Sequence, residues 1–229
     1  PHLEIIVIND GSTDNTHDVV TKFVEQYQKK HLKSSIPIRY KRIPNSGKAC
    51  ALNIALSMAQ GDVIITIDSD SAMDPNAIKN MVKHFTDPRV ASVAGNVVIG
   101  NRSRPIGFLQ QLEYLYGFYF KRADSLLNAV YIVGGAAASY RRQVITNLGG
   151  FDENSITEDI ELSTRLQDNG YHVRYAADAI VYTEGPPDFK GLCRQRLRWK
   201  FGRLLTFYKY RHLFFSLNRR HNFYLSFVI

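Results

Sequence analysis

The stretch Gly61-Asp-Val-Ile-Ile-Thr-Ile-Asp-Ser-Asp-Ser71 decides the fold. Its apolar, β-branched run from Val63 to Ile67 predicts a strand that is buried on both faces of a sheet. Asp68 and Asp70 follow directly. We therefore expect both carboxylates at the carboxyl edge of that sheet, where open α/β proteins bind their ligands.

Two interpretations of these acids are open. Two carboxylates at one edge repel each other unless a cation or a donor-rich ligand compensates them. Mg²⁺ takes oxygen ligands and usually keeps substrate phosphates in its shell, so Asp68 and Asp70 are candidates for a metal–diphosphate site. The alternative is a polar strand-to-helix turn in which Asp74-Pro75 caps the next helix. Asp and Ser are ordinary turn residues, so this stretch alone does not decide between the two.

Strands and helices are predicted to alternate around this stretch. Apolar runs predict strands over 3–8, 36–43 and 90–99, and helical spacing or small residues predict helices over 16–30, 49–58 and 75–85. This order is typical of an α/β protein with a largely parallel sheet and helices on its faces. Asp10 follows the first strand and should reach the same edge as Asp68 and Asp70. The sequence has no glycine-rich dinucleotide or P-loop fingerprint, which argues against NAD and ATP.

The composition changes in the second half of the chain. Residues 106–120 predict an aromatic helix, whose rings are either core packing or face a membrane or a sugar chain. The stretch Gly134-Gly135-Ala136-Ala137-Ala138-Ser139 has no bulky side chain, so a neighbouring element or a ligand approaches its backbone closely. Thr157-Glu158-Asp159 starts a predicted helix, where acids ordinarily serve the cap and the helix dipole. Short strands are predicted over 173–176 and 180–182.

The charge of the chain is unevenly distributed. The 229 residues are 45% hydrophobic and 22% charged, as in a folded globular protein, and the net charge is +8. Residues 190–229 contain ten Lys and Arg and no Asp or Glu, whereas residues 1–189 contain nineteen basic and twenty-one acidic residues. Aromatic residues are interleaved with the basic ones, which is typical of a segment at an anionic membrane surface. We therefore predict a catalytic domain over 1–189 and a membrane-interface segment over 190–229.

The ends of the sequence and its cysteines give further expectations. No run of about twenty apolar residues is present, so no complete membrane span is predicted. The apolar run at 222–229 fits the first turns of a truncated span, and the chain enters its first strand soon after Pro1, so we expect an excerpt from a longer polypeptide. Cys50 and Cys193 form no disulfide framework or metal pattern and suit a reducing compartment. No signal peptide is visible.

Five motifs resemble, in their order and approximate spacing, those of the family 2 glycosyltransferases. More narrowly, they resemble the membrane-embedded processive synthases of hyaluronan, chitin, cellulose and poly-N-acetylglucosamine. The motifs are Asn9-Asp10-Gly11-Ser12, Asp68-Ser69-Asp70, Gly149-Gly150-Phe151-Asp152, Thr157-Glu158-Asp159 and Gln195-Arg196-Leu197-Arg198-Trp199. Each motif alone is weak evidence for the family, but the five together extend over nearly the whole chain. The Gln-x-x-Arg-Trp pattern distinguishes the processive synthases from other family members, because those that transfer a single sugar generally lack it.

The resemblance implies a fold and a set of partners. The fold is the nucleotide-sugar-binding glycosyltransferase A type, with a mostly parallel central sheet, helices on both faces and C-terminal amphipathic interface helices. The implied partners are a UDP-sugar donor, a growing polysaccharide acceptor and Mg²⁺ or Mn²⁺, with no nucleic acid. The implied location is the cytoplasmic face of the cell membrane, reached through the C-terminal segment and flanking membrane helices that the chain lacks. The family also places another strand before Leu3, so we expect the N-terminal strand of the domain to be missing.

The resemblance also implies roles on the donor side. Asp10 accepts from the uracil ring, Asp68 lies beside the ribose and the metal, and Asp70 ligates the metal across the diphosphate. The metal neutralises the charge that grows on the leaving UDP. Lys48 either reaches the nucleotide or is a solvated surface amine. Arg198 should hold the diphosphate, because a guanidinium matches phosphate oxygens bidentately.

On the acceptor side, Asp159 is the implied general base and Glu158 is the other member of the catalytic pair. A single base opposite the leaving group implies inversion, so an α-linked UDP-sugar gives a β-linkage. Trp199 should stack on the acceptor sugar, or else anchor the protein at the membrane interface. The remaining acceptor-binding candidates are Gln195, Arg196, Gly134 and Gly135.

Four other functions are alternatives to processive synthesis. A transferase that adds one sugar to a lipid acceptor would be separated from a synthase by the size of its product. A non-catalytic module that binds a nucleotide-sugar or a phospholipid has no need of a base such as Asp159. A nucleic-acid binder leaves the acids unexplained, and a receiver-like phospho-acceptor domain would not need the stretch after Gly100. The sequence does not identify the sugar, although N-acetylglucosamine is the preferred expectation.

Overall fold

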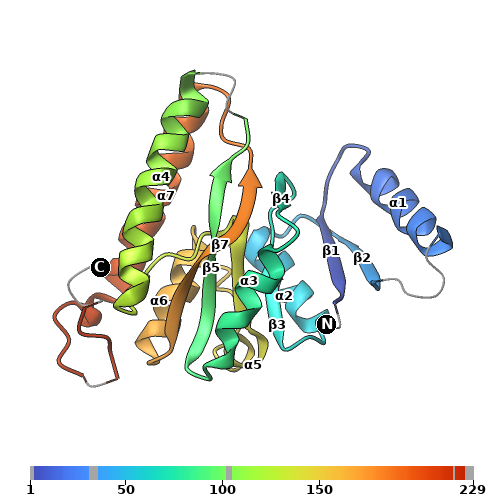
Figure 1. The fold of residues 1–229 in the computed structure, drawn as a ribbon. Helices are drawn as coiled ribbons and strands as arrows, with labels where there is room; N and C mark the ends of the chain where they lie inside the picture. Colours follow the sequence, from blue (N-terminus) through green and yellow to red (C-terminus); the bar gives the residue numbers. More distant parts are fainter. Residues whose placement is uncertain (1–2, 31–35, 102–104, 219, 225–229) are drawn as a thin grey trace.

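The computed structural model describes residues 3–30, 36–101, 105–218 and 220–224 (Figure 1). The strands are β1 (Ile5–Asp10), β2 (Ile38–Ile43), β3 (Val63–Thr66), β4 (Ser71–Met73), β5 (Val90–Ile99), β6 (Ala138–Arg141) and β7 (His172–Thr183). The α-helices are α1 (Thr16–Lys30), α2 (Lys48–Met58), α3 (Ala77–Val82), α4 (Pro105–Leu126), α5 (Arg142–Asn147), α6 (Glu158–Asp168) and α7 (Phe189–Lys209). Short 3-10 helices are η1 (Lys83–Thr86), η2 (Gly135–Ala137) and η3 (Arg211–Leu213).

Five strands form one sheet in the order β3-β6-β5-β7-β4, and β1 and β2 form a separate parallel pair. The long strands β5 and β7 are parallel and lie side by side in the middle of the molecule (Figure 1). β6 pairs antiparallel with β3 and with β5, and β4 pairs antiparallel with β7. The sheet is therefore mixed.

The prediction of a mostly parallel sheet is wrong, and the reason lies in two strands that were not predicted. β3, β5 and β7 run in the same direction, because β6 is antiparallel to both β3 and β5. β6 and β4 run the other way. β6 is four residues, Ala-Ser-Tyr-Arg, and β4 is only three, so neither has the length or alternation that marks a strand in a sequence.

β3 itself differs from its prediction. It is the outer strand of the five-stranded sheet and ends at Thr66, which is the one residue of the strand that is buried. The apolar run was expected to be covered on both faces. Its apolar side chains from Val63 to Ile65 are only half-buried, so the strand is not fully covered on both faces.

Helices cover both faces of this sheet, as predicted, and a hydrophobic cluster fills each face. On one face, α2, α5 and α6 pack against β5, β6 and β7 through residues such as Leu52, Ile145, Leu162, Leu166, Tyr140 and Val173. On the other face, α3 and η1 pack against β5 and β7 through Met81, Phe85, Val90, Val93 and Val181. The sheet is thus a rigid support for the loops at its edge.

The helices α4 and α7 run along one side of the molecule (Figure 1). Arg196 on α7 forms an ion pair with Glu113 on α4, with Nη2 and Oε2 2.7 Å apart. α7 also approaches α6 closely, because a Cβ on Gly202 would lie 2.5 Å from the Thr157 side chain. The predicted domain boundary at 189/190 falls at the start of α7 and stays a prediction, and the last residues of the predicted interface segment, 225–229, lie outside the described residues.

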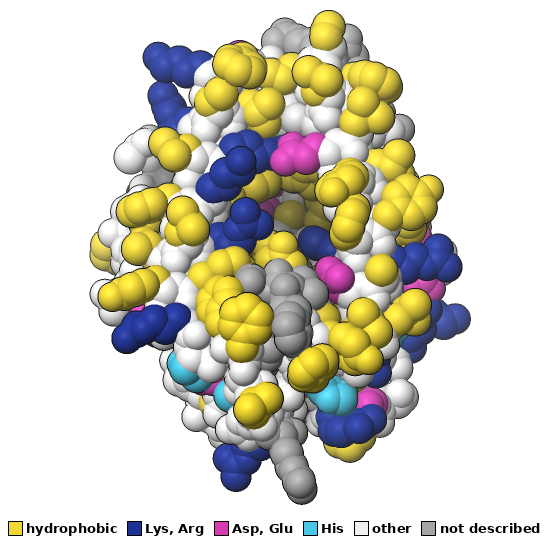
Figure 2. Space-filling view, turned by 90° about the vertical axis from the view of Figure 1, so that its left-hand side faces the viewer, with side chains coloured by type: hydrophobic (Ala, Val, Ile, Leu, Met, Phe, Trp, Pro, Cys, Tyr) yellow, Lys and Arg dark blue, Asp and Glu magenta, His cyan; other side chains and the backbone are white. Residues whose placement is uncertain are grey.

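Most of the aromatic residues of α4 are exposed, whereas Phe118 packs on the core, with its ring centroid 6.0 Å from that of Tyr175. Phe108, Tyr116 and Tyr119 are more than half exposed, at 57%, 66% and 63%. Large apolar side chains on α7 are exposed as well (Leu197, Phe201, Leu204 and Tyr208). Figure 2 looks onto this side of the molecule and shows hydrophobic side chains gathered around a hollow, with Lys, Arg, Asp and Glu among them. No helix in the described ranges is both long and apolar enough to span a membrane.

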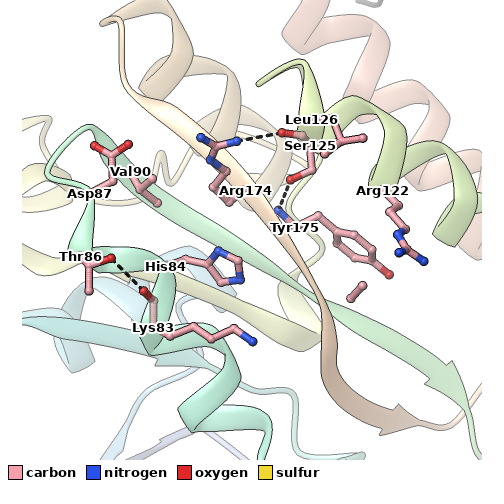
Figure 3. A pocket seen from close by; sticks show the side chains of 11 residues that line it. Lys83, His84, Thr86, Asp87, Val90, Arg122, Ser125, Leu126, Arg174 and Tyr175 are labelled. Carbon is pink, nitrogen blue, oxygen red and sulfur yellow. Dashed lines mark hydrogen bonds between the residues drawn. The ribbon is translucent and has the colours of Figure 1, made fainter.

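An open cavity of about 470 Å³ lies between η1, the C-terminal end of α4 and β7 (Figure 3). Its lining includes His84, Arg122, Arg174 and Tyr175, and Arg174 donates to the carbonyl oxygen of Ser125 at 3.0 Å. None of the residues that the sequence analysis proposed for the site lines this cavity. The candidate site is therefore built elsewhere.

Candidate active site

Three predicted site residues, Asp68, Glu158 and Gly135, meet around the ammonium of Lys48. Its Nζ donates to Asp68 Oδ1 at 2.7 Å and lies 3.4 Å from Glu158 Oε1. A Cβ on Gly135 would lie 2.9 Å from the same nitrogen. Lys48 begins α2, Asp68 follows β3 and Glu158 begins α6, so three separate elements deliver these side chains to one cluster.

The carboxylates around Lys48 keep its ammonium charged. Burial lowers the pKa of Lys48, but the charges of Asp68, Glu158 and Asp159 outweigh burial and leave the pKa above its usual value. Glu158 is only 6% exposed. Burial raises the pKa of Glu158, Asp159 raises it further, and Lys48 partly opposes both. Lys48 is thus an ion-paired amine, although part of its side chain is in contact with solvent.

Asp159 is oriented by two backbone N–H groups. Gly135 donates to Oδ2 and Ile160 donates to Oδ1, both at 2.8 Å. A Cβ on Gly135 would lie 3.3 Å from Oδ2, whereas a Cβ on Gly134 would meet nothing within 4 Å. The small-residue stretch was predicted to allow a close approach to its backbone, and at Gly135 the group that approaches is the acidic start of α6. Each oxygen of Asp159 keeps a lone pair for a further hydrogen bond.

Asp10 holds the loop that precedes α2 and Lys48. Its two carboxylate oxygens accept from the backbone N–H groups of Ser46 and Gly47, at 2.7 and 2.9 Å. Gly47 has a φ of +89°, which a glycine adopts readily. Within the described ranges no hydrogen bond or ion pair joins Asp10 to Asp68 or Asp70, so Asp10 is connected to Asp68 through this loop and Lys48.

A polar turn and a metal site after β3 are both compatible with the structure, because different residues serve them. Asp74 Oδ1 accepts from the backbone N–H of Asn76 at 2.9 Å, so a turn forms before α3 as expected. Asp74 does not cap the helix, however, because the N-cap of α3 is Asn76, which makes no side-chain cap hydrogen bond. Asp68 and Asp70 take no part in that turn. Asp70 is exposed, and its Oδ1 accepts from the Ser71 hydroxyl at 3.1 Å.

Asp68 and Asp70 offer carboxylate oxygens, which are the kind of ligand that a hard divalent cation takes. Within the described ranges, no group of three or more His, Cys, Asp and Glu side chains is arranged to hold a metal ion. Mg²⁺ is commonly held by one or two carboxylates together with substrate phosphates and water. The pair Asp68 and Asp70 matches that mode of binding, in which a nucleotide diphosphate supplies the remaining oxygens.

The C-terminal motif is packed against α4. Arg196 donates through Nε and Nη2 to both carboxylate oxygens of Glu113, and through Nη1 to Gln195. Its guanidinium lies over the Trp199 ring, 4.4 Å from the ring centroid. Arg198 is exposed, and its guanidinium has no hydrogen-bond or ion-pair partner among the residues that the structure describes. The structure therefore joins Gln195, Arg196 and Trp199 and does not bring Arg198 to the carboxylates.

Tyr114 on α4 lies beside this motif and was not proposed from the sequence. The Arg196 guanidinium lies 5.9 Å from the centre of its ring. Burial raises the pKa of Tyr114, Arg196 opposes the increase, and Glu113 and Asp70 add to it. The Arg196 guanidinium thus lies near the Tyr114 ring of α4 as well as over the Trp199 ring of its own helix.

Two more residues beside the acids were also missed. Tyr140 on β6 is fully buried, and its hydroxyl has no hydrogen-bond partner in the described part of the chain. Burial, Asp159 and Glu158 raise the pKa of Tyr140 well above its usual value. Lys121 on α4 is half-buried, and burial lowers its pKa against the opposing charges of Asp159 and Asp124. Tyr140 lies between Ser139 and Arg141 and Lys121 lies between Phe120 and Arg122, and neither belongs to a motif that would predict a position beside the acids.

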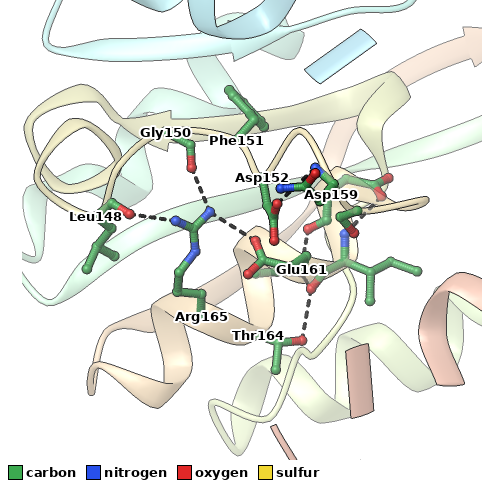
Figure 4. A network of polar contacts seen from close by, with 12 residues as sticks. Leu148, Gly150, Phe151, Asp152, Asp159, Glu161, Thr164 and Arg165 are labelled. Atoms are coloured by element: carbon green, nitrogen blue, oxygen red, sulfur yellow. Dashed lines mark hydrogen bonds and ion pairs between the residues drawn. The ribbon is translucent and has the colours of Figure 1, made fainter. Parts of the chain in front are cut away.

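A buried network around Glu161 fixes α6 (Figure 4). Glu161 Oε1 accepts from Lys209 Nζ at 2.8 Å and from the Tyr210 hydroxyl at 2.6 Å, and Oε2 accepts from Arg165 Nη2 at 2.9 Å. Lys209 ends α7. Because Glu161 is 2% exposed, these bonds tie the helix that carries Asp159 firmly to the helix that carries Trp199.

The motif Gly149-Gly150-Phe151-Asp152 belongs to the same network. Arg165 donates to the carbonyl oxygens of Leu148 and Gly150, and Asp152 accepts from Lys209 at 2.8 Å. Gly149 and Gly150 have φ values of +89° and +76°, so both are in the left-handed region that favours glycine. The motif thus supports α6 and does not contribute a side chain to the Lys48 cluster.

Comparison with known proteins adds to this geometry. Residues 1–202 match the family model described as glycosyltransferase like family 2. The poly-beta-1,6-N-acetyl-D-glucosamine synthase of Staphylococcus aureus (strain COL) is 35% identical over 202 residues, which are 87% of this chain and 47% of that protein. The protein of the same description from Staphylococcus epidermidis is 32% identical over 205 residues, 88% of this chain and 48% of that protein. This chain spans about half the length of the curated relatives it matches.

Solved structures show the same fold. A mannosyltransferase from Pyrobaculum calidifontis in complex with GDP-Man and Mn²⁺ superposes with a TM-score of 0.74 and 25% identity, over 93% of this chain and 56% of that one. GalNAc-T7 with UDP, GalNAc and Mn²⁺ superposes with a TM-score of 0.59 and 14% identity, over 83% of this chain and 41% of that one, which is a likeness of fold alone. The α/β fold is of the glycosyltransferase A-like kind, and the chain belongs to glycosyltransferase family 2.

Proposed function

We propose that the chain is the catalytic domain of an inverting glycosyltransferase that moves a sugar from a UDP-sugar to the end of a growing β-linked polysaccharide. One observation carries the proposal. The ammonium of Lys48 joins Asp68, the candidate donor-side acid, to Glu158, and Asp159 is held beside them by Gly135. Donor-side and acceptor-side acids from distant parts of the chain thus share one cluster, as a transfer reaction between two bound sugars requires.

The donor-side residues bind and orient the nucleotide. Asp10 holds the loop that presents Lys48, and its role toward uracil is proposed from the family. Lys48 would bind the nucleotide from α2. Asp68 and Asp70 would hold Mg²⁺ or Mn²⁺ together with the diphosphate, and a cation bound there would supply positive charge against the departing UDP. The exposed guanidinium of Arg198 is proposed as a second contact for the diphosphate.

Asp159 acts as the general base. It takes the proton of the attacking acceptor hydroxyl while the new bond forms from that oxygen to the anomeric carbon, and the bond from that carbon to the UDP oxygen breaks. Attack opposite the leaving group inverts the anomeric centre. Such a positioned base contributes about 10²–10⁴-fold to the rate. The N–H groups of Gly135 and Ile160 hold the carboxylate in orientation without occupying all of its lone pairs.

The acceptor and the membrane are proposed on the side of α4 and α7. Trp199, with Arg196 stacked on it and Gln195 next to it, offers an aromatic surface for a sugar ring. Gly134 and Gly135 leave space for the acceptor end. The exposed apolar side chains of α4 and α7, together with the basic residues after Lys190, suit the cytoplasmic face of a membrane.

The relatives favour one sugar. The two staphylococcal relatives named above are synthases of poly-β-1,6-N-acetyl-D-glucosamine, so UDP-N-acetylglucosamine is the proposed donor and the same polymer is the proposed product. Transfer of one sugar to a lipid acceptor is the other candidate within this family.

The test uses the full-length protein in membranes. It is incubated with UDP-N-acetylglucosamine, UDP-glucose and UDP-glucuronate in turn, and the product is measured by size. Long chains from UDP-N-acetylglucosamine are expected, and an Asp159→Asn variant should lose at least tenfold of polymer synthesis, since a base typically contributes about 10²–10⁴-fold. Asp178→Asn, an exposed acid paired with Lys83, is the matched control. Synthesis by Asp159→Asn within tenfold of wild type overturns the base, and a one-sugar product overturns the processive assignment.

A further inference from the structure

Lys48 forms an ion pair with Asp68, the carboxylate that is also proposed to bind the divalent cation. Its Nζ is 2.7 Å from Asp68 Oδ1, and an ammonium so close to a carboxylate repels a second cation that binds the same group. Glu158 Oε1 is the next carboxylate oxygen, 3.4 Å from Nζ. Lys48 thus has one close partner on the donor side and a second, slightly more distant partner at the start of α6.

We propose that Lys48 and the divalent cation compete for Asp68, and that Glu158 receives the displaced ammonium when the cation binds. Lys48 is then a positioning residue with two positions, and Glu158 is its anchor in the second. This inference rests on the proposed function, in which Asp68 contributes to the metal site.

The charges of the cluster favour this exchange. Three carboxylates (Asp68, Glu158 and Asp159) act on the ammonium of Lys48, and Asp159 also acts on Lys121, so the five groups carry a formal excess of one negative charge when all are ionised. A divalent cation at Asp68 would offset that excess. The displaced ammonium would still pair with Glu158. This pairing matters because a buried carboxylate such as Glu158 is costly to leave without a cation.

The geometry limits how far Lys48 moves. Its backbone is at the start of α2, where Asp10 holds the preceding loop through Ser46 and Gly47. The ammonium therefore changes partner by rotation of its own side chain and not by a shift of the helix. Gly135 provides the clearance for this rotation, since a Cβ there would lie 2.9 Å from Nζ.

The test is a double-mutant cycle on Mn²⁺ affinity, measured as the Mn²⁺ concentration that gives half-maximal binding of labelled UDP at a fixed, saturating UDP concentration, on the full-length protein purified in detergent. Lys48→Met should bind Mn²⁺ about two- to fivefold more tightly, the range that the loss of one partly exposed ion pair gives. Glu158→Gln should bind Mn²⁺ more weakly by a similar factor, because the displaced ammonium loses its anchor. The double variant should match Lys48→Met alone, because no ammonium remains to be displaced. Lys83→Met, which removes the cation of the Lys83–Asp178 pair, is the control and should not change the affinity.

Two outcomes overturn the inference and are distinguishable. If Asp68→Asn abolishes Mn²⁺ binding but Lys48→Met leaves it unchanged, the competition is wrong while the metal site of the proposed function stands. If Asp68→Asn leaves Mn²⁺ binding unchanged, the metal assignment falls and the competition falls with it. If the effects of Lys48→Met and Glu158→Gln simply add in the double variant, Glu158 acts on the cation directly and is not the anchor of Lys48.

Discussion

The backbone N–H of Gly135 donates a 2.8 Å hydrogen bond to Oδ2 of Asp159. It brings the glycine before β6 against the first turn of α6, although the two residues belong to motifs that the sequence does not connect. A side chain at position 135 would enter the space between Asp159 and Lys48. A substitution of Gly135 therefore tests whether Asp159 and its neighbouring acids form the reacting centre.

Gly135→Ala is expected to lower sugar transfer by about tenfold to a hundredfold, since a misplacement of about 1 Å costs up to 10²-fold. The new Cβ would lie 2.9 Å from Lys48 Nζ and 3.3 Å from Asp159 Oδ2, so these two groups must move apart. The measurement is the initial rate of polymer synthesis in membranes. Gly117→Ala on α4 is the control, because a Cβ there meets nothing within 4 Å. Equal rates for Gly135→Ala and Gly117→Ala would show that this geometry is irrelevant to transfer.

Glu158 makes stability depend on pH in a defined direction. Burial and the neighbouring Asp159 raise the pKa of Glu158 above the ordinary value of a glutamate, which is about 4.3. The folded protein therefore binds this proton more tightly than the unfolded chain, and ionised Glu158 destabilises the fold above the raised pKa. That penalty is absent below about pH 4.3 and grows as the pH rises through the raised pKa. The melting temperature of Glu158→Gln should accordingly rise relative to wild type over this window. A melting-temperature difference that is constant from pH 4 to about pH 8 contradicts the assignment.

The strands that were predicted from the sequence are those with long runs of β-branched residues. β5 was predicted with the bounds that it has, and α1, α2 and α6 lie within two residues of their predicted positions. The direction of the sheet was not predictable in the same way. β6 consists of small and polar residues between a glycine-rich stretch and α5, and only its tertiary pairing with β3 and β5 makes it a strand.

The site was predictable where a motif carries its chemistry in adjacent residues. Asp68, Glu158 and Asp159 were proposed from such motifs, and the structure brings all three to Lys48. Glu161 was missed, because an acid in the first turn of a helix is usually explained by the helix dipole. Its partners Lys209 and Tyr210 lie about fifty residues away, and no local pattern reveals such a distant pairing.

The stacking of Arg196 on Trp199 gives a prediction for chain length. Trp199→Ala should shorten the polymer while the KM for the UDP-sugar changes less than about twofold, because an aromatic platform for the acceptor contributes to holding the chain and not the donor. Arg196→Lys should have the same effect in weaker form, since lysine cannot keep the forked contact with Glu113. The measurement is the size distribution of the product at a fixed UDP-sugar concentration.

Arg194→Lys provides the matched comparison for Arg196→Lys, because it makes the same change at an exposed position on α7. It should leave the size distribution unchanged. Long chains made at the normal rate by Trp199→Ala would remove Trp199 from the acceptor site and favour its alternative role as a membrane-interface anchor.

The hydrogen bond from Tyr210 to Glu161 makes the junction of α6 and α7 a measurable part of stability. Tyr210→Phe removes a 2.6 Å bond to a buried carboxylate and should lower the free energy of unfolding by about 1.5–3 kcal/mol. Tyr208→Phe makes the same change at a side chain that is 70% exposed, and its effect should stay within about 0.5 kcal/mol. The comparison is made by urea denaturation of the two variants and wild type. The fold itself should be retained, because Lys209 and Arg165 still pair with Glu161. If Tyr210→Phe lowers the free energy of unfolding no more than Tyr208→Phe does, the Tyr210–Glu161 bond does not hold the two helices together.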